Sequence, residues 1–428
     1  MKRTISINVP SITRVEGEGS LSLEIKAGRI THLQLKIYEP PRYFEKFLQG
    51  RDYNEVIDIV ARICGICPVA YQMSAATAIE NSFNVQVSDW VQAMRRVLYC
   101  GEWIESHSLH IHLLALPDYF GFNTAIEMAK DYPEIVTRGM RLQSLGNQLV
   151  ALLGKRSVHP VGACVGGFYF APKSDEVKSL GEKLHTGLEL AHALLEWLMQ
   201  LGRPNHPQAL HCVALKDKTE YAILGGDIVS NSGLHCGAHD FEQHFKESQV
   251  DYSTALHCLL HDKSYLVGPL ARLNLNSERL PKALRQKIDT KQWPSNNMFD
   301  SIIARAIEIV YAFSTAIDIL RDYETTHHPH CQVKPKAGNG YGVTEAPRGL
   351  LWHRFNMGED GRVVDCDIVP PTSQNQAHIE QDLLHSLQQF GLDNDKEAIR
   401  LHAEKIIRNY DPCISCSTHF LNVTIHNA

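Results

Sequence analysis

Hydrophobic and polar residues alternate between positions 5 and 38, near the start of the chain. In the runs 21–25 and 33–37, Leu or Ile occupies every odd position and polar residues separate them. A period of two is typical of strands that bury one face and expose the other. We therefore predict a small antiparallel sheet over residues 5–38.

Helical spacing of apolar residues dominates from about residue 54 onward. We predict helices over 54–61, 68–82, 88–115, 124–154, 174–202, 299–323, 376–390 and 395–410. Ser174 has the position of an N-cap for one of them, and Gly202 follows its end. Asn394, with Glu397 three residues later, resembles a capping box for the last helix.

Two regions interrupt the helical pattern. Residues 205–275 are mixed and rich in His, which predicts an irregular insertion with short strands. Residues 338–370 begin with a glycine-rich segment and continue as strand-like sequence. No repeat, linker or low-complexity run divides the chain. We therefore predict one domain over 1–428, mainly α with small antiparallel β elements (α+β), with a helical core over 54–410.

Composition and charge exclude several classes of protein. Of the 428 residues, 44% are hydrophobic and 21% are charged, which is close to the globular average and unlike a disordered chain. The net charge of −6 argues against a nucleic-acid-binding protein. We expect no membrane span, because no stretch approaches roughly 18 consecutive apolar residues. The first residues lack the apolar core of a signal peptide, so we expect a cytoplasmic location.

Cysteine usage gives the first candidate chemistry. The odd number of eleven cysteines makes a disulfide framework improbable. Four of them form two Cys-x-x-Cys pairs near opposite ends of the chain, Cys64/Cys67 and Cys413/Cys416. Two such pairs can form a four-thiolate site for a soft or borderline metal. A structural zinc site and a redox dithiol are the alternatives, although zinc modules usually keep their pairs within tens of residues.

Further short segments accompany the cysteine pairs and are weak signals individually. They are RVEG at 14–17, RYFE at 42–45, ESHSLH at 105–110, LPDY at 116–119 and TEAPRG at 344–349. Together with the cysteine pairs, they resemble the large subunit of nickel-iron hydrogenases. The sequence is most similar to the alpha subunit of soluble NADP-linked hydrogenases, also called sulfhydrogenases. The resemblance extends from about residue 6 to residue 419 and implies the large-subunit fold.

The resemblance also implies a set of metal ligands. Cys64, Cys67, Cys413 and Cys416 would bind nickel, with Cys67 and Cys416 bridging to an iron that carries carbon monoxide and cyanide.

A separate magnesium ion would be held by Glu45, the backbone carbonyl of Ile368 and His419. Oxygen-rich ligation suits magnesium, and the use of a terminal His comes from the family pattern.

Catalytic roles follow from the same resemblance. Arg348 would be a fixed cation beside the iron, and Pro371 and Thr372 would lie near the cyanides as hydrogen-bond partners. Because Arg is almost always protonated, we expect the Cys413 thiolate to accept the proton first and Glu16 to relay it. The chain departs from the family pattern at Tyr71, where many relatives have His, and at Gln374, where an aromatic residue is common.

The end of the chain divides into a metal motif and a tail. Residues 411–419 hold the second cysteine pair and His419, and the resemblance implies that 420–428 are a maturation peptide, cleaved after His419. The alternative is a permanent edge strand, because Leu421, Val423 and Ile425 alternate with polar residues.

The function implied is reversible heterolytic cleavage of H2 in the catalytic subunit of a cytoplasmic nickel-iron hydrogenase. No further cysteine set for iron–sulfur clusters is apparent, so an iron–sulfur small subunit is expected as a partner. The family adds flavin subunits that reduce NAD(P), a maturation protease and nickel chaperones. A non-catalytic H2 sensor, a structural zinc protein and a quinone-site subunit of the complex I type are alternatives; the last class lacks the four cysteines.

Overall fold

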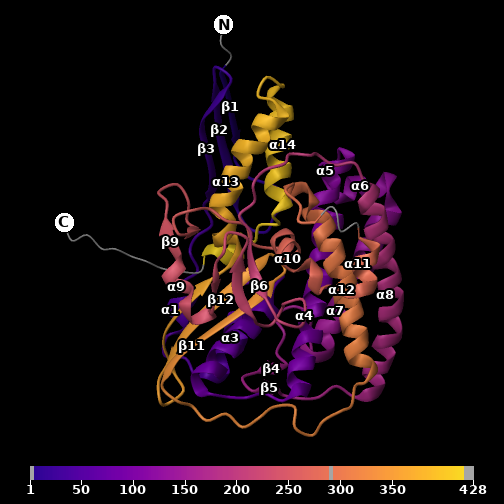
Figure 1. Ribbon diagram of the computed structural model, residues 1–428, viewed down its shortest axis with the longest axis vertical. Helices are drawn as coiled ribbons and strands as arrows, with labels where there is room; N and C mark the ends of the chain where they lie inside the picture. The colour runs from indigo at the N-terminus through magenta and orange to yellow at the C-terminus, as the bar shows by residue number, and fades with distance from the viewer. Residues whose placement is uncertain (1–3, 289–292, 419–428) are drawn as a thin grey trace, which may run out of the picture.

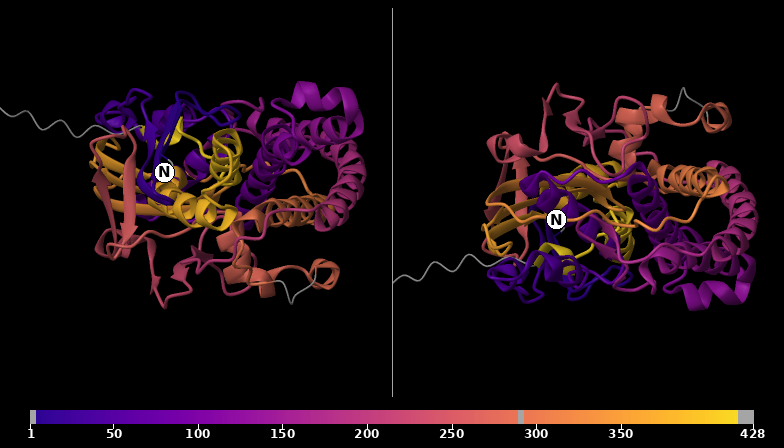
Figure 2. Two further views of the ribbon diagram at one scale, coloured as in Figure 1. Left: turned by 90° about the horizontal axis from the view of Figure 1, so that it is seen from above. Right: turned by 90° about the horizontal axis from the view of Figure 1, so that it is seen from below.

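The computed structural model describes residues 4–288 and 293–418. A bundle of long helices occupies one side of the molecule, and the sheet β11–β13 with helix α3 occupies the other (Figure 1; Figure 2). The N-terminal sheet projects at one end beside the last two helices of the chain (Figure 1). This mainly helical architecture with small antiparallel sheets is the fold class that the sequence predicts.

The N-terminal sheet is antiparallel, in the order β1 (Thr4–Val9), β2 (Gly19–Lys26) and β3 (Arg29–Ile37). Alternate side chains are buried, as the period of two predicts. The buried face packs against α13 (Pro371–Phe390) and α14 (Lys396–Asn409) in one hydrophobic cluster. The N-terminal sheet is thereby joined to the last two helices of the chain.

The helical bundle contains α4 (Asp89–Leu109), α7 (Pro133–Gly154), α8 (Ser174–Gln200) and α12 (Ser301–Arg321). Helix α12 is buried on nearly every face and contacts both α4 and α8. Helices α4 and α7 approach closely at two glycines: a Cβ on Gly146 would lie 2.6 Å from the backbone nitrogen of Glu105. The bundle is therefore a rigid support for the residues on α4.

The central layer consists of helix α3 (Pro68–Phe83) lying on the antiparallel sheet β11 (Gly338–Ala346), β12 (Gly349–Met357) and β13 (Val363–Val369). Glycines on β11 permit this contact, because a Cβ on Gly342 would lie 2.1 Å from the carbonyl oxygen of Ser74 on α3. The contact fixes the start of α3, and Cys67 directly precedes that helix.

Residues 205–275 form the predicted short strands: β6 (Val213–Lys216), β7 (Asp227–Ser230), β8 (His235–Cys236), β9 (Phe245–Gln249) and β10 (Leu256–Leu260). The remaining elements are short. They are α1 (Phe44–Leu48), α2 (Tyr53–Val60), α5 (Leu116–Phe120), α6 (Ala125–Asp131), β4 (Ala163–Cys164), β5 (Gly167–Phe168), α9 (Phe241–His244), α10 (Pro269–Asn276) and α11 (Lys282–Lys287).

Three predicted helices differ from the structure at a boundary that lies beside a proline. The predicted helix 124–154 is two helices, because Pro133 begins a new one as its first residue. The predicted helix 88–115 ends as α4 at Leu109, continues as a π-helical turn over His110–Ala115 and then becomes α5, with Pro117 in its first turn. Helix α13 begins at Pro371, five residues before the predicted start.

Both predicted N-caps were displaced by one residue. Asp395, and not Asn394, caps α14, because its carboxylate accepts hydrogen bonds from the amides of Glu397 (2.9 Å) and Ala398 (3.0 Å). Ser174 is the first residue of α8, which follows Lys173 at the N-cap position.

Across the described residues, none of the helices combines the length and the apolar character that crossing a membrane requires.

Candidate metal centre

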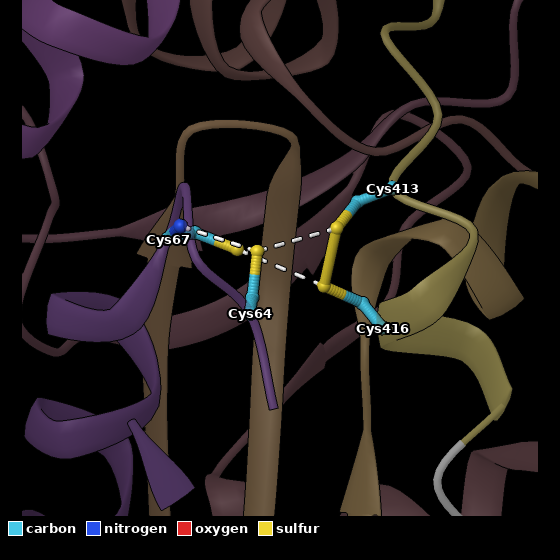
Figure 3. A group of neighbouring side chains, drawn as sticks. All are labelled: Cys64, Cys67, Cys413 and Cys416. Atoms are coloured by element: carbon cyan, nitrogen blue, oxygen red, sulfur yellow. Dashed lines mark hydrogen bonds between the residues drawn. A yellow bond between two sulfur atoms is a disulfide. The ribbon is translucent and has the colours of Figure 1, made fainter. Parts of the chain in front are cut away.

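The four cysteines of the two Cys-x-x-Cys pairs meet in the interior (Figure 3). Their sulfur atoms all lie within 4.8 Å of one another, and all four residues are buried. The Cys64 and Cys413 sulfurs are 3.4 Å apart, and those of Cys67 and Cys416 are 3.7 Å apart. Among the described residues, this is the one group of three or more His, Cys, Asp or Glu that can hold a metal ion.

The first pair lies on the tight turn between α2 and α3. The backbone amides of Ile66 and Cys67 donate to the Cys64 sulfur over 3.3 Å and 3.2 Å, which fixes the turn. Gly65 at its tip is exposed and Ile66 is half-buried. The first cysteine pair therefore lies directly beneath the molecular surface.

A buried carboxylate orders the start of α3. Glu102 on α4 accepts hydrogen bonds from the amides of Val69 (2.6 Å) and Ala70 (3.0 Å), two of the free donors at the N-terminus of that helix. These contacts fix α3 against α4 directly after Cys67.

The second pair follows α14: Cys413 lies just before a short 3-10 turn (Ser415–Thr418) that carries Cys416, and other parts of the chain hold the backbone of the pair. The amide of Cys413 donates to the Thr372 hydroxyl (3.0 Å). The amide of Ile414 donates to the Glu16 carbonyl (3.0 Å), and that of Ser415 donates to the Glu16 carboxylate (3.1 Å). The motif is thus docked by residues that are far from it in sequence.

The sulfur set fits a soft metal. Four sulfurs at about 2.3 Å from one tetrahedral metal lie about 3.8 Å apart, close to the two separations across the pairs. Cys413 and Cys416 are joined by a sulfur–sulfur bond in the structure. A metal ion held by all four sulfurs requires thiolates, so this bond and the metal-bound form exclude each other.

Arg348 is buried and is held by Asp411, which lies two residues before Cys413. Its Nε donates to the Asp411 carbonyl (2.7 Å), and its Nη2 donates to the Asp411 carboxylate (3.1 Å). Burial alone would lower the pKa of Arg348, but the charges of Asp411 and Cys67 raise it above that of free arginine. The guanidinium is therefore a fixed cation close to the first cysteine pair.

The other residues implied by the family pattern are only partly placed. The carboxylate of Glu45 on α1 accepts from the amide of Ile368 on β13 (2.9 Å), so these two expected magnesium ligands are neighbours. His419 and the tail 420–428 lie outside the described residues. Pro371 begins α13, which brings the next residue, Thr372, onto Cys413.

The two departures from the family pattern have different surroundings. The Tyr71 hydroxyl is buried, has no hydrogen-bond partner within the described ranges, and its ring lies 5.7 Å from that of His353. Burial and the nearby Cys67 raise the pKa of Tyr71, so its hydroxyl stays protonated. Gln374 has a structural role, since its amide donates to the carbonyls of Leu350 (2.6 Å) and Val369 (3.2 Å).

Sequence reasoning missed several residues at the site. Asp411 and Glu102 were assigned no role, because single Asp and Glu residues are most often exposed. Arg42 belongs to a segment that the sequence singled out, but its contacts were not predicted. Glu105 begins the ESHSLH segment that the sequence singled out but was assigned no role: burial raises its pKa to about 8, although Arg348 opposes the shift.

Comparisons with known proteins agree with this geometry. The family model of nickel-dependent hydrogenases matches residues 42–138 and 205–419. Sulfhydrogenase 1 subunit alpha of Pyrococcus furiosus is 31% identical, over 98% of this chain and 99% of its own length. Sulfhydrogenase 2 subunit alpha of the same organism is 32% identical, over 97% of this chain and 100% of its own.

Solved structures show the same fold. A crystal structure of an NAD+-reducing [NiFe]-hydrogenase in the H2-reduced state superposes with a TM-score of 0.87 at 25% identity, covering 97% of this chain and 99% of that one. The [NiFeSe]-hydrogenase of Dm. baculatum gives a TM-score of 0.78 at 20% identity, over 97% of this chain and 100% of that one, which concerns the fold alone. The chain therefore belongs to the nickel-dependent hydrogenase family, as a catalytic large subunit of the nickel-iron type.

Proposed function

We propose that this chain cleaves H2 reversibly into protons and electrons and that the electrons pass through an iron–sulfur small subunit towards NAD(P). The observation that carries the proposal is the convergence of four buried cysteine sulfurs from opposite ends of the chain. The names of its relatives support it, since they include sulfhydrogenase alpha subunits and the NAD-reducing hydrogenase HoxS subunit beta of Cupriavidus necator.

The four cysteines would hold nickel, and Cys67 and Cys416 would be shared with an iron bearing carbon monoxide and cyanide. When bound, this metal pair supplies a Lewis acid that polarises H2 and takes up its electrons. The chain contributes a water-poor setting, because all four cysteines and Arg348 are buried. The positive charge of Arg348 stabilises negative charge that develops beside the cysteines. Pro371 and Thr372 would lie near the cyanide ligands of the iron as hydrogen-bond partners.

Proton movement would begin at the Cys413 thiolate and continue through Glu16. Glu16 and Cys413 pair through their backbones, and the Glu16 carboxylate contacts the next turn of the motif at Ser415. Glu16 is half-buried, so its side chain is in contact with both the buried motif and the solvent. A carboxylate in this position can accept a proton from the interior and release it outward.

Electrons would leave through the surface at Gly65 and Ile66, where the first cysteine pair lies directly beneath the surface. Exposed apolar side chains lie close by: His159 Nδ1 donates to the Ala61 carbonyl (2.7 Å), which places the exposed Val158 and Val161 beside this turn. Because the described residues contain no second cysteine group, iron–sulfur clusters must come from the partner. We propose that the small subunit docks here.

Other features of the family stay predictions. A magnesium ion held by Glu45, Ile368 and His419 is supported by the contact between the first two. Cleavage after His419, flavin subunits that reduce NAD(P), a preference for NADP, a maturation protease, nickel chaperones and a cytoplasmic location are likewise proposals. The carbon monoxide and cyanide ligands would be detected as infrared bands between those of protein and water.

Isotope exchange tests the activity. The purified complex should form HD from D2 in ordinary water, and Cys64→Ser should abolish this exchange because it removes a soft thiolate. Cys331→Ser is the matched control, since the same atom is changed in a half-buried cysteine outside the group. Exchange at the wild-type rate in Cys64→Ser would contradict the proposal.

A further inference from the structure

Arg42 lies between the two cysteine motifs and donates hydrogen bonds to both. Its Nη2 donates to the carbonyl of Ile63 (2.7 Å), directly before Cys64. The same nitrogen donates to the carbonyl of Ser415, which lies between Cys413 and Cys416. The backbone amide of Arg42 donates to the carbonyl of Thr418 (2.7 Å).

Other residues that hold the C-terminal motif form hydrogen bonds with that motif and not with the turn that carries Cys64. Glu16, Thr372 and Arg348 bind the backbone of residues 411–415, and none of those hydrogen bonds reaches the turn that carries Cys64. Arg42 therefore differs from them, because one guanidinium nitrogen sets the separation of the two cysteine-bearing loops.

The guanidinium is itself held in place. It lies over the ring of Phe44, 5.3 Å from the ring centroid, and its side chain is partly buried. A guanidinium is planar and permanently charged, so it offers donors at fixed angles to two carbonyls, whereas a lysine offers a flexible point charge. This geometry suits a clasp between two loops better than it suits a surface ion pair.

We propose that Arg42 is a positioning residue that clasps the C-terminal cysteine motif onto the N-terminal one and so retains metal in the four-sulfur site. The inference rests on the proposed function. The hydrogen bonds from Arg42 to Ser415 and Thr418 exist only while the C-terminal motif is docked. Arg42 therefore stabilises the closed site selectively over any state in which residues 411–418 are undocked.

The test uses the full-length chain in its complex and the variants Arg42→Gln and Arg42→Lys. Two quantities are measured: the rate at which a chelator removes nickel, and amide hydrogen exchange over residues 414–418. We expect nickel loss at least about 10-fold faster in Arg42→Gln, with faster exchange confined to that segment, and a smaller change in Arg42→Lys.

Arg51→Lys is the matched control. Arg51 also lies over a phenylalanine ring, 4.5 Å from the centroid of Phe47, and its Nε also donates to a backbone carbonyl, but it does not contact the cysteine motifs. We expect wild-type nickel loss and wild-type exchange in this variant. Added methylguanidinium should slow nickel loss in Arg42→Ala, because it refills the position that the side chain vacates.

The outcomes separate the clasp from the proposed function. Wild-type nickel retention and wild-type exchange in Arg42→Gln would refute the clasp and leave the metal site intact. If the wild-type chain carried no nickel, the proposed function would fail, and exchange over 414–418 would then decide the clasp alone. Equal losses in Arg42→Gln and Arg51→Lys would also refute it, since the effect would be one of general stability.

Discussion

At the scale of single residues, the candidate centre combines buried sulfurs with one buried cation and one half-buried carboxylate. The Arg348 guanidinium is anchored by Asp411, and the Glu16 carboxylate is anchored by the Ser415 amide. Each charged group thus has a fixed position relative to the cysteines. Three substitutions test the contributions of Glu16, of Arg348 and of the buried, uncharged His402.

Glu16→Gln should separate proton transfer from metal binding. Glutamine keeps an oxygen that can accept from the Ser415 amide but cannot ionise, so the motif stays docked while the relay is lost. We expect hydrogen isotope exchange to fall by at least about 100-fold, with nickel and iron contents unchanged. Mass-spectrometric HD formation measures the first and elemental analysis the second. Exchange at the wild-type rate would exclude Glu16 from the proton path.

Arg348→Lys replaces a planar guanidinium, which donates several hydrogen bonds at fixed angles, by a compact ammonium group. Lysine cannot reproduce both hydrogen bonds to Asp411, and it leaves a gap where the guanidinium was packed. We expect turnover to fall at least about 100-fold, which corresponds to roughly 2.7 kcal/mol of transition-state stabilisation. The H2 oxidation rate of the metal-loaded variant measures this. Near-normal turnover would reduce Arg348 to a packing residue.

His402→Phe should change how stability depends on pH. His402 on α14 stacks on Phe390 with ring centroids 4.2 Å apart, and burial lowers its pKa to about 3. The unfolded chain binds this proton near pH 6.5, so stability that is present above pH 6.5 is lost as the pH falls towards 3. Phenylalanine keeps the ring contact and does not titrate.

Denaturant unfolding at two pH values measures the effect. Between pH 8 and pH 5, wild type should lose about 2 kcal/mol more unfolding free energy than His402→Phe. Parallel losses in the two proteins would mean that His402 is already free to protonate in the folded state.

At the scale of elements, the position of Cys67 depends on the contact between α3 and the sheet β11–β13. Two glycines of β11 face backbone atoms of α3: a Cβ would lie 1.8 Å from the Ala78 carbonyl oxygen at Gly340 and 2.1 Å from that of Ser74 at Gly342. Such distances are below van der Waals contact, so any side chain there must move the helix or the strand.

Gly342→Ala should therefore lower the unfolding free energy by about 1–3 kcal/mol, because backbone atoms cannot give way as a side chain does. Gly181→Ala on α8 is the control: no atom lies within 4 Å of its added Cβ, and alanine favours a helix by roughly 0.5–1 kcal/mol. Thermal unfolding of both variants should show opposite shifts. A neutral result at Gly342 would mean that α3 and β11 are not in close contact.

Elements with a strong apolar period could be predicted from the sequence. Helix ends and caps were predicted less well, because local polar residues determine them. The N-terminal sheet and helices α3, α8 and α12 lie within a few residues of their predicted positions. Helix α13 was predicted too short, because its first turn consists of buried polar residues that show no apolar period. The cap at Asp395 was missed, since Asn394 beside it has the same preference.

At the scale of the whole molecule, the fold brings residues 349 positions apart into sulfur–sulfur contact. The cysteine pairs were predictable because the Cys-x-x-Cys spacing is itself a recognisable pattern of metal and redox sites. Arg42, Glu102 and Asp411 were not. Arg42 and Glu102 bind backbone atoms of distant segments, and Asp411 binds the distant Arg348 guanidinium, and no local pattern encodes these contacts. The sequence thus indicated the candidate ligands, and the tertiary structure shows which residues hold the two cysteine pairs in place.

The proposed activity requires that the four sulfurs are ligands of one nickel-iron site. Elemental analysis of the purified complex, for wild type and for Cys416→Ser, tests this most directly. We expect one nickel per chain in the wild type, with one iron beyond those of the partner's clusters, and loss of both from Cys416→Ser, because we propose that both metals bind this residue. Zinc in place of nickel in the wild type, or full nickel occupancy in Cys416→Ser, would contradict the account.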